Sequence, residues 1–275
     1  HDPQVAATYL EYWTALSGDP VADELQNELE ALTPDPGATL DEGVTCLFSP
    51  RNSAWMLTWY AARISDAKQV VMFTGAFGVN EKLADAFALD RDILRYLVLE
   101  KPPTSKTQAL LGANDDQDII VVPGQVLGEV WELNDEGEAT LRRPIPGFEL
   151  ENWFLHEELF RKSGNIFFIH LKMLMIDALS DDPLVFTGSA NFSDNSLTSN
   201  DENMLLIRGN TRVADIYLTE YDRILRHFYF RNFAAKADDA AEAAKAIFLD
   251  ENDRWLRPYY KDTGLKARRQ ALFFG

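Results

Sequence analysis

The sequence is most informative at residues 170–203, which read HLKMLMIDALSDDPLVFTGSANFSDNSLTSNDEN. His170 and Lys172 stand two positions apart before an apolar run, and a Gly-Ser-x-Asn turn and an Asn-Asp-Glu-Asn cluster follow. Alternate side chains of a strand point to the same face of a sheet, so we expect His170 and Lys172 to lie side by side. Such a pair suits the binding of an anion.

The residue types in this stretch favour catalysis on an anionic group. A histidine at the end of a strand can act as a nucleophile or a general acid, and a carboxylate must then stabilise its charged form. Glu202 is the natural candidate for that carboxylate. Lys172 supplies a fixed positive charge, while Ser189 and Asn191 add neutral donors at a tight turn. Together they predict a pocket for a tetrahedral anion, and a phosphoryl group fits best.

Each part of the pattern also has a purely structural interpretation. His-x-Lys occurs in many unrelated proteins, and Gly-Ser-x-Asn is by itself an ordinary turn. The cluster at residues 200–203 could simply cap a strand or solvate a loop. The order and spacing of all three parts within one stretch nevertheless favour the catalytic interpretation.

The composition limits the classes of function. A chain of 275 residues that is 46% hydrophobic can bury a full core. The net charge of −18 argues against binding nucleic acid mainly by electrostatics, because that mode needs Lys and Arg to replace counterions along the phosphates. The single cysteine, Cys46, excludes an internal disulfide framework and is expected to be buried in a strand. No apolar run reaches the length of about 18 residues that would span a membrane.

Helix and strand patterns predict two parts in the chain. Residues 1–43 read as an N-terminal amphipathic helix, with Val5, Tyr9, Tyr12, Trp13 and Leu16 inward, and an acidic linker. From residue 44 strands alternate with helices, which predicts an α/β domain over residues 44–275. We expect a mixed, mostly parallel sheet with helices on both faces and the chemistry at the strand ends.

The later elements are predicted in less detail. A hairpin is expected around residues 134–137, and residues 165–189 contain three short strands or strand ends. A long helix follows at 211–230, with Val213, Ile216, Tyr217, Tyr221, Ile224, Leu225 and Phe228 inward, and another at 236–249. His156 is interpreted as structural rather than catalytic, and His227 is expected at the edge of the long helix.

The motifs resemble those of the phospholipase D superfamily. Its signature is His-x-Lys, four residues, Asp, and then Gly-Ser-x-Asn. The matching residues of this chain are His170, Lys172, Asp177, Gly188, Ser189 and Asn191. The match extends to Asn200 and Glu202, and the resemblance covers roughly residues 44–230.

The resemblance implies a mechanism with two such motifs facing each other across one site. One histidine attacks phosphorus to form a phosphohistidine, and the other protonates the leaving alcohol. By this match His170 is one of the two histidines, Glu202 orients it, and Lys172, Ser189 and Asn191 bind phosphate oxygens. Asp177, Gly188 and Asn200 belong to the structural part of the motif. No metal or cofactor is implied.

Only one His-x-Lys motif is present, because neither His1, His156 nor His227 is followed by Lys at the second position. The sequence therefore predicts the C-terminal half of a longer phosphodiesterase or phosphatidyltransferase, whose first motif lies upstream of His1. The alternatives are a homodimer that pairs two copies of His170, as in the single-motif nucleases of the family, or a non-catalytic domain that only binds. A phospholipid-like diester is the expected substrate and nucleic acid is not expected; the cellular compartment is not indicated.

Overall fold

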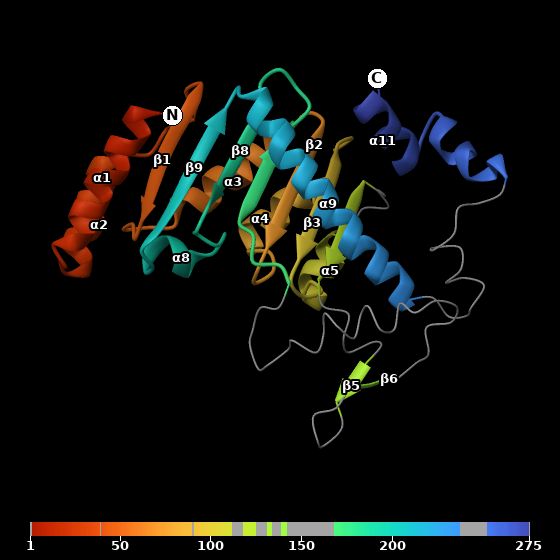
Figure 1. The fold of residues 1–275 in the computed structure, drawn as a ribbon, viewed down its shortest axis with the longest axis horizontal. Coiled ribbons are helices and arrows are strands. Elements are labelled where there is room, and N and C mark those ends of the chain that lie inside the picture. Colours follow the sequence, from red (N-terminus) through yellow and green to blue (C-terminus); the bar gives the residue numbers. More distant parts are fainter. Residues whose placement is uncertain are drawn as a thin grey trace.

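A seven-stranded mixed sheet forms the centre of the computed structural model (Figure 1). The structure describes residues 2–38, 40–89, 91–111, 118–124, 131–133, 139–141, 168–236 and 252–274. In spatial order the strands are β1 (Gly43–Ser49), β9 (Glu202–Arg208), β8 (Leu184–Gly188), β7 (Met173–Ile176), β2 (Val70–Gly75), β3 (Leu94–Leu99) and β4 (Ile119–Pro123). The expected α/β class with a mixed sheet between helices is confirmed.

The pairing of neighbouring strands is more antiparallel than expected. Only β2 with β3 and β3 with β4 are parallel, whereas β1–β9, β9–β8, β8–β7 and β7–β2 are antiparallel. The turn at residues 177–183 explains part of this result, because a parallel crossover needs about a dozen residues or more and this turn is shorter. The expectation of a mostly parallel sheet is therefore wrong for neighbouring pairs.

One face of the sheet is covered by α3 (Trp55–Asp66), α4 (Glu81–Phe87) and α5 (Ser105–Leu111) (Figure 1). Strand β2 shows how the core forms, because it is buried on both faces. Val71 and Phe73 join the cluster beneath these helices, while Val70 and Met72 join the cluster on the opposite face. The period of two along a strand thus feeds two hydrophobic layers from one apolar run.

The opposite face is covered by α9 (Thr211–Lys236), with η1 (Asp253–Tyr260) and α11 (Leu265–Phe274) beyond it (Figure 1). Tyr221 of α9 is fully buried, and its hydroxyl donates to the carbonyl oxygens of Phe73 and Tyr96 at 3.1 and 2.7 Å. The predicted inward face of α9 is confirmed except at Ile216, which is 60% exposed.

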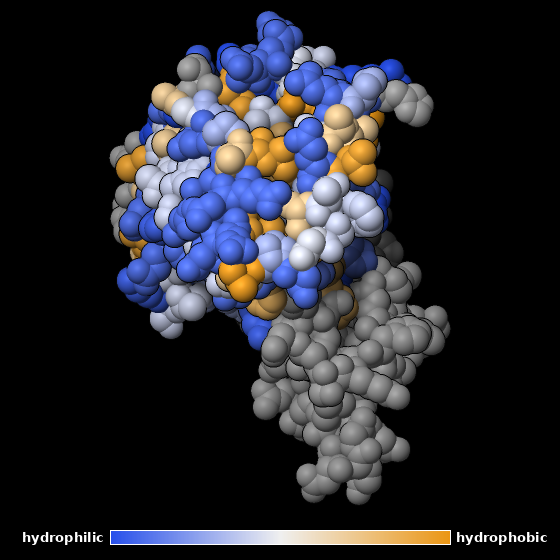
Figure 2. Space-filling model, turned by 90° about the vertical axis from the view of Figure 1, so that its left-hand side faces the viewer, coloured by the Kyte–Doolittle hydropathy of each residue, from blue (hydrophilic) through white to orange (hydrophobic). Residues whose placement is uncertain are grey.

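Helices α1 (Pro3–Ser17) and α2 (Ala22–Leu32) pack against the edge strand β1. The Tyr12 ring stacks on Phe48 with centroids 4.1 Å apart, and Cys46 is buried nearby as expected. Trp13 was expected to face inward but is 65% exposed. Figure 2 looks onto this side of the molecule, where hydrophilic residues dominate and apolar ones are scattered.

The remaining predictions are tested only where the structure describes them. Strands β5 (Trp131–Leu133) and β6 (Ala139–Leu141) pair antiparallel, which confirms the hairpin. His156 and the helix expected at residues 236–249 lie outside the described residues, apart from the first residue of that helix. Within the described part of the chain, no helix is both long and apolar enough to cross a membrane.

Candidate functional site

Apart from Asp177, the motif residues lie at one end of the sheet, where β8 ends and β7 and β9 begin. The short helix α8 (Asp194–Thr198) lies at this end (Figure 1). His170 and Lys172 directly precede β7, Ser189 directly follows β8, and Glu202 begins β9. Because β8 runs antiparallel to both of its neighbours, its end lies beside the starts of β7 and β9. The topology therefore gathers residues that are up to 32 positions apart in sequence (170 to 202).

Lys172 is buried at this end, with 9% of its surface exposed, whereas His170 is exposed. The Lys172 ammonium donates to the His170 carbonyl oxygen at 2.7 Å, so it binds the backbone of His170 and not its ring. Burial lowers the pKa of Lys172, and the nearby Glu202 carboxylate opposes that effect. The two residues lie in a loop before β7 and not within a strand, so the alternation expected along a strand does not apply to them, and a side-by-side arrangement of their side chains stays a prediction.

Thr74, at the end of β2, fixes this loop. Its hydroxyl donates to the Leu171 carbonyl oxygen at 2.8 Å and accepts the Met173 amide hydrogen at 2.9 Å. The hydroxyl therefore replaces a pair of backbone hydrogen bonds at the point where β7 begins. The sequence signal for Thr74 is a polar residue inside the apolar run KQVVMFTGAF, which sequence reasoning did not use.

Gly188 ends β8 in a place that has no room for a side chain. A Cβ atom at this position would lie 2.0 Å from the Asn203 carbonyl oxygen. That oxygen accepts the Ser189 amide hydrogen at 2.9 Å, and the Asn203 amide nitrogen donates to Ser189 Oγ at 3.0 Å. The glycine of the motif thus allows β8 and β9 to approach closely where Ser189 is presented.

Asn191 and Lys172 line the same pocket, whose volume is about 220 Å³. The turn after β2, at residues 75–80, forms its other wall. The Asn191 Nδ2 atom donates to Ser196 Oγ at a long 3.4 Å, and its Oδ1 atom is buried without a partner. His170 and Ser189 do not line this pocket, but they lie at the same end of the sheet.

Glu202 is held beside the pocket by its neighbours. Its side chain accepts a hydrogen bond from Asn200 Nδ2 at 3.3 Å, and its backbone oxygen accepts from the Tyr12 hydroxyl at 3.3 Å. Among the residues that the structure describes, no hydrogen bond joins Glu202 to His170. The orienting role of Glu202 toward His170 therefore stays a prediction.

Asp177 lies at the opposite end of β7 and has a structural part. Its carboxylate accepts the amide hydrogens of Lys68, Gln69 and Val70 at 2.7 to 3.1 Å. Its φ of +50° places the backbone in the left-handed region. The motif aspartate thus ties the turn after β7 to the start of β2.

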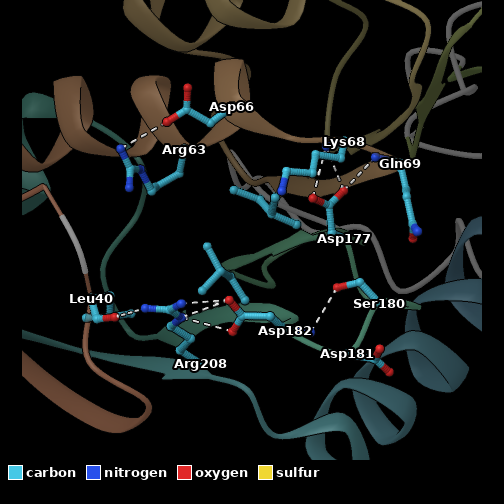
Figure 3. A pocket seen from close by; sticks show the side chains of 12 residues that line it. Leu40, Arg63, Asp66, Lys68, Gln69, Asp177, Ser180, Asp181, Asp182 and Arg208 are labelled. Atoms are coloured by element: carbon cyan, nitrogen blue, oxygen red, sulfur yellow. Dashed lines mark hydrogen bonds and ion pairs between the residues drawn. The ribbon is translucent and has the colours of Figure 1, made fainter.

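A larger pocket of about 460 Å³ surrounds Asp177 (Figure 3). Its charged side chains largely satisfy one another, since Arg208 pairs with Asp182 at 2.7 Å and Arg63 pairs with Asp66 at 3.1 Å. Neither His170 nor Lys172 lines it, because the length of β7 separates them from Asp177. This larger pocket is therefore not the candidate site. No group of His, Cys, Asp and Glu side chains that could hold a metal occurs among the described residues.

The comparisons with known proteins agree with the motif. The family model described as the PLD-like domain of cardiolipin synthase matches residues 147–225, which contain the His-x-Lys and Gly-Ser-x-Asn elements. Residues 147–225 are therefore similar to a phospholipase D-like domain. No curated protein sequence matches this chain.

Three solved structures illustrate the similarity in fold. The phospholipase D family member Nuc from Salmonella typhimurium is 16% identical, with a TM-score of 0.42, and covers 66% of this chain and 93% of its own. NucT from Helicobacter pylori is 19% identical, with a TM-score of 0.43, over 66% of this chain and 94% of its own. Phosphatidylserine synthase from Haemophilus influenzae is 12% identical, with a TM-score of 0.38. The match covers 75% of this chain and 45% of the synthase.

Within this phospholipase D-like chain the predicted site residues divide into three groups. Lys172 and Asn191 share the small pocket, while His170, Ser189 and Glu202 lie around it at the same strand ends. Gly188 and Asn200 support these residues, and Asp177 lies at the far end of β7. Sequence reasoning missed Thr74, Tyr9, Tyr12 and Phe77, which come from elements distant in the chain.

Proposed function

We propose that this chain is a phospholipase D-type phosphodiesterase or phosphatidyltransferase that forms a covalent phosphohistidine at His170. The observation that carries the proposal is that the buried Lys172 and the half-buried Asn191 line one pocket at the end of the sheet where His170 also lies. A buried cation and an amide suit the non-bridging oxygens of a phosphodiester, and an exposed imidazole beside them can reach phosphorus.

In the proposed reaction the neutral His170 ring attacks phosphorus, and the bond from phosphorus to the leaving alcohol oxygen breaks. A second histidine gives that oxygen a proton, and then takes one from water or an acceptor alcohol. The new oxygen attacks phosphorus, the bond to His170 breaks, and the histidine is regenerated. The chain has only one His-x-Lys motif, so the second histidine comes from a preceding half or from a second copy.

The surroundings of Lys172 support an electrostatic part in this reaction. A charge in a buried, poorly hydrated place interacts more strongly with a ligand than one in water. Burial removes hydration from the Lys172 ammonium and so lowers its pKa. An incoming phosphoryl oxygen would restore the lost interaction, which favours anion binding in this pocket.

The amide of Asn191 can serve the same anion after a rotation by half a turn. In the present orientation the Asn191 Oδ1 atom has no partner. After the rotation Oδ1 would occupy the place of Nδ2 and could accept a hydrogen bond from Ser196 Oγ. The Nδ2 group would then be free to donate to a phosphoryl oxygen. The unpartnered oxygen thus supports a ligand-binding role for Asn191.

The rim of the pocket favours a diester with an apolar part. Phe77 lines the pocket and is 64% exposed, and Leu171, next to His170, is 40% exposed. The turn that carries Phe77 is tight, since a Cβ on Gly75 would lie 2.5 Å from the Gly78 carbonyl oxygen, and Gly78 has a φ of +97°. An apolar side chain held beside an anion pocket fits a phospholipid-like substrate, and the net charge of −18 disfavours nucleic acid.

Hydrolysis of a short-chain phospholipid in solution tests the proposal. We expect His170→Ala to reduce the rate by at least about 10³-fold, because the nucleophile is lost. His227→Ala, on α9, serves as the matched control and should keep the wild-type rate. If two copies supply the two histidines, the rate per chain should rise with protein concentration; if a preceding half supplies one, adding that half should restore turnover.

Substantial activity of His170→Ala would contradict the proposal. Equal loss in both variants would also contradict it, since His227 has no part in the proposed reaction.

A further inference from the structure

Asn203 lies between the motif serine and a tyrosine of the N-terminal helix. Its Nδ2 group donates to Ser189 Oγ at 3.1 Å, and its Oδ1 atom accepts from the Tyr9 hydroxyl at 2.8 Å. Its backbone nitrogen also donates to Ser189 Oγ, at 3.0 Å. Three hydrogen bonds thus connect α1 to Ser189 through one asparagine.

The two bonds to Ser189 decide which way its hydroxyl can act. A serine hydroxyl has one hydrogen to donate and two lone pairs that accept. Both acceptor positions of Ser189 Oγ are taken by Asn203, through its main-chain and side-chain nitrogens. Ser189 therefore has only its hydrogen left to offer, and no acceptor among the described residues takes it.

Tyr9 determines the orientation of the Asn203 side-chain amide, and this orientation leaves Ser189 only its hydrogen to donate. With the amide reversed, Oδ1 would face Ser189 and accept the hydrogen that a ligand needs. The Tyr9 hydroxyl has no other hydrogen-bond partner in the part of the chain that the structure describes, so the present orientation is the one that satisfies its hydrogen. Burial raises the pKa of Tyr9 to about 12, which keeps it protonated and able to donate at neutral pH.

We infer that Tyr9 and Asn203 are positioning residues that make Ser189 an obligate hydrogen-bond donor to an anionic substrate oxygen. The inference rests on the proposed function, because it assumes that a phosphoryl group binds at Ser189. It assigns a role at the site to α1, which lies far outside the matched residues 147–225. A hydroxyl that can only donate favours an anionic oxygen, because a charged acceptor forms a stronger hydrogen bond than a neutral one.

A double-mutant cycle with inorganic phosphate as the probe tests the inference. Phosphate affinity of the full chain is measured by amide chemical shifts for wild type, Tyr9→Phe, Ser189→Ala and the double variant. Ser189→Ala should weaken binding about tenfold, through loss of a hydrogen bond to a charged group. Tyr9→Phe should weaken it about threefold or more, and should have no further effect once Ser189 is absent.

Tyr217→Phe on α9 is the matched control, and thermal unfolding checks that each variant is folded. Effects of Tyr9→Phe and Ser189→Ala that multiply would overturn the inference, since Tyr9 would then not act through Ser189. An unchanged affinity of Tyr9→Phe would overturn it as well.

The outcome separates this inference from the proposed function. If wild type does not bind phosphate, both fail together. If the cycle shows the expected coupling while His170→Ala keeps its hydrolytic activity, the catalytic proposal fails and the positioning role stands. If His170→Ala is inactive but the effects of Tyr9→Phe and Ser189→Ala on phosphate affinity multiply, only the positioning role fails.

Discussion

At the scale of single residues, the motif side chains differ in how far the protein itself satisfies their polar atoms. Gly188 is required because the Asn203 carbonyl oxygen occupies the space of a side chain, and Asp177 ties down three amides at the start of β2. Lys172 and Asn191 instead carry polar atoms that the protein only partly satisfies. The sequence could predict which residues belong to the motif. It could not predict which of them contact the backbone and which keep unsatisfied polar atoms, because that depends on contacts between distant segments.

The burial of Lys172 predicts a specific pH dependence of stability. Because its pKa is lowered, chiefly by burial, the folded protein holds this proton less tightly than the unfolded chain does. Stability should therefore rise with pH through the window between the lowered pKa and the ordinary value of 10.5. We expect the free energy of unfolding of wild type, relative to Lys172→Met, to increase across that window in urea titrations.

The exposed Lys261→Met serves as the control for the general effect of removing a lysine charge. A difference between wild type and Lys172→Met that stays flat, or falls as pH rises, would contradict the burial of this ammonium.

At the scale of elements, the apolar periodicity of the sequence predicted most helices and strands. It did not predict how many residues of each helix are buried against the sheet. Trp13 and Ile216 fit the apolar periodicity of α1 and α9, yet both are exposed. Each helix contacts one sheet face, so residues at the margin of the apolar stripe extend beyond the contact. Strand direction was equally beyond periodicity, because it depends on the order of strands in the sheet.

Helix α1 offers a direct test of this margin, since Tyr12 and Trp13 are adjacent in sequence but differ in burial. Tyr12→Ala removes the ring that stacks on Phe48 and should cost about 3 kcal/mol in the free energy of unfolding. Trp13→Ala should change it by no more than about 0.5 kcal/mol, because its ring is largely in solvent. Urea unfolding measures both, and equal costs would contradict the described packing of α1.

For the whole molecule, the sheet separates two polar ends. The small pocket with Lys172 lies at the end where β8 finishes, and the larger, mutually paired pocket with Asp177 lies at the other. The sequence could predict the residues near His170 because they fall within one stretch of the chain. It could not predict Thr74, Tyr9 or Phe77, which reach the site only through the sheet order and the packing of α1.

The covalent step at His170 is the central claim, and one measurement tests it most directly. The chain, supplied with a second motif where turnover requires it, is mixed with a short-chain phospholipid, quenched in alkali and analysed by peptide mass spectrometry. We predict a phosphoryl adduct on His170 that appears during turnover and is absent from His170→Ala. Turnover without an adduct on His170, or with one on another residue of this chain, would contradict the account.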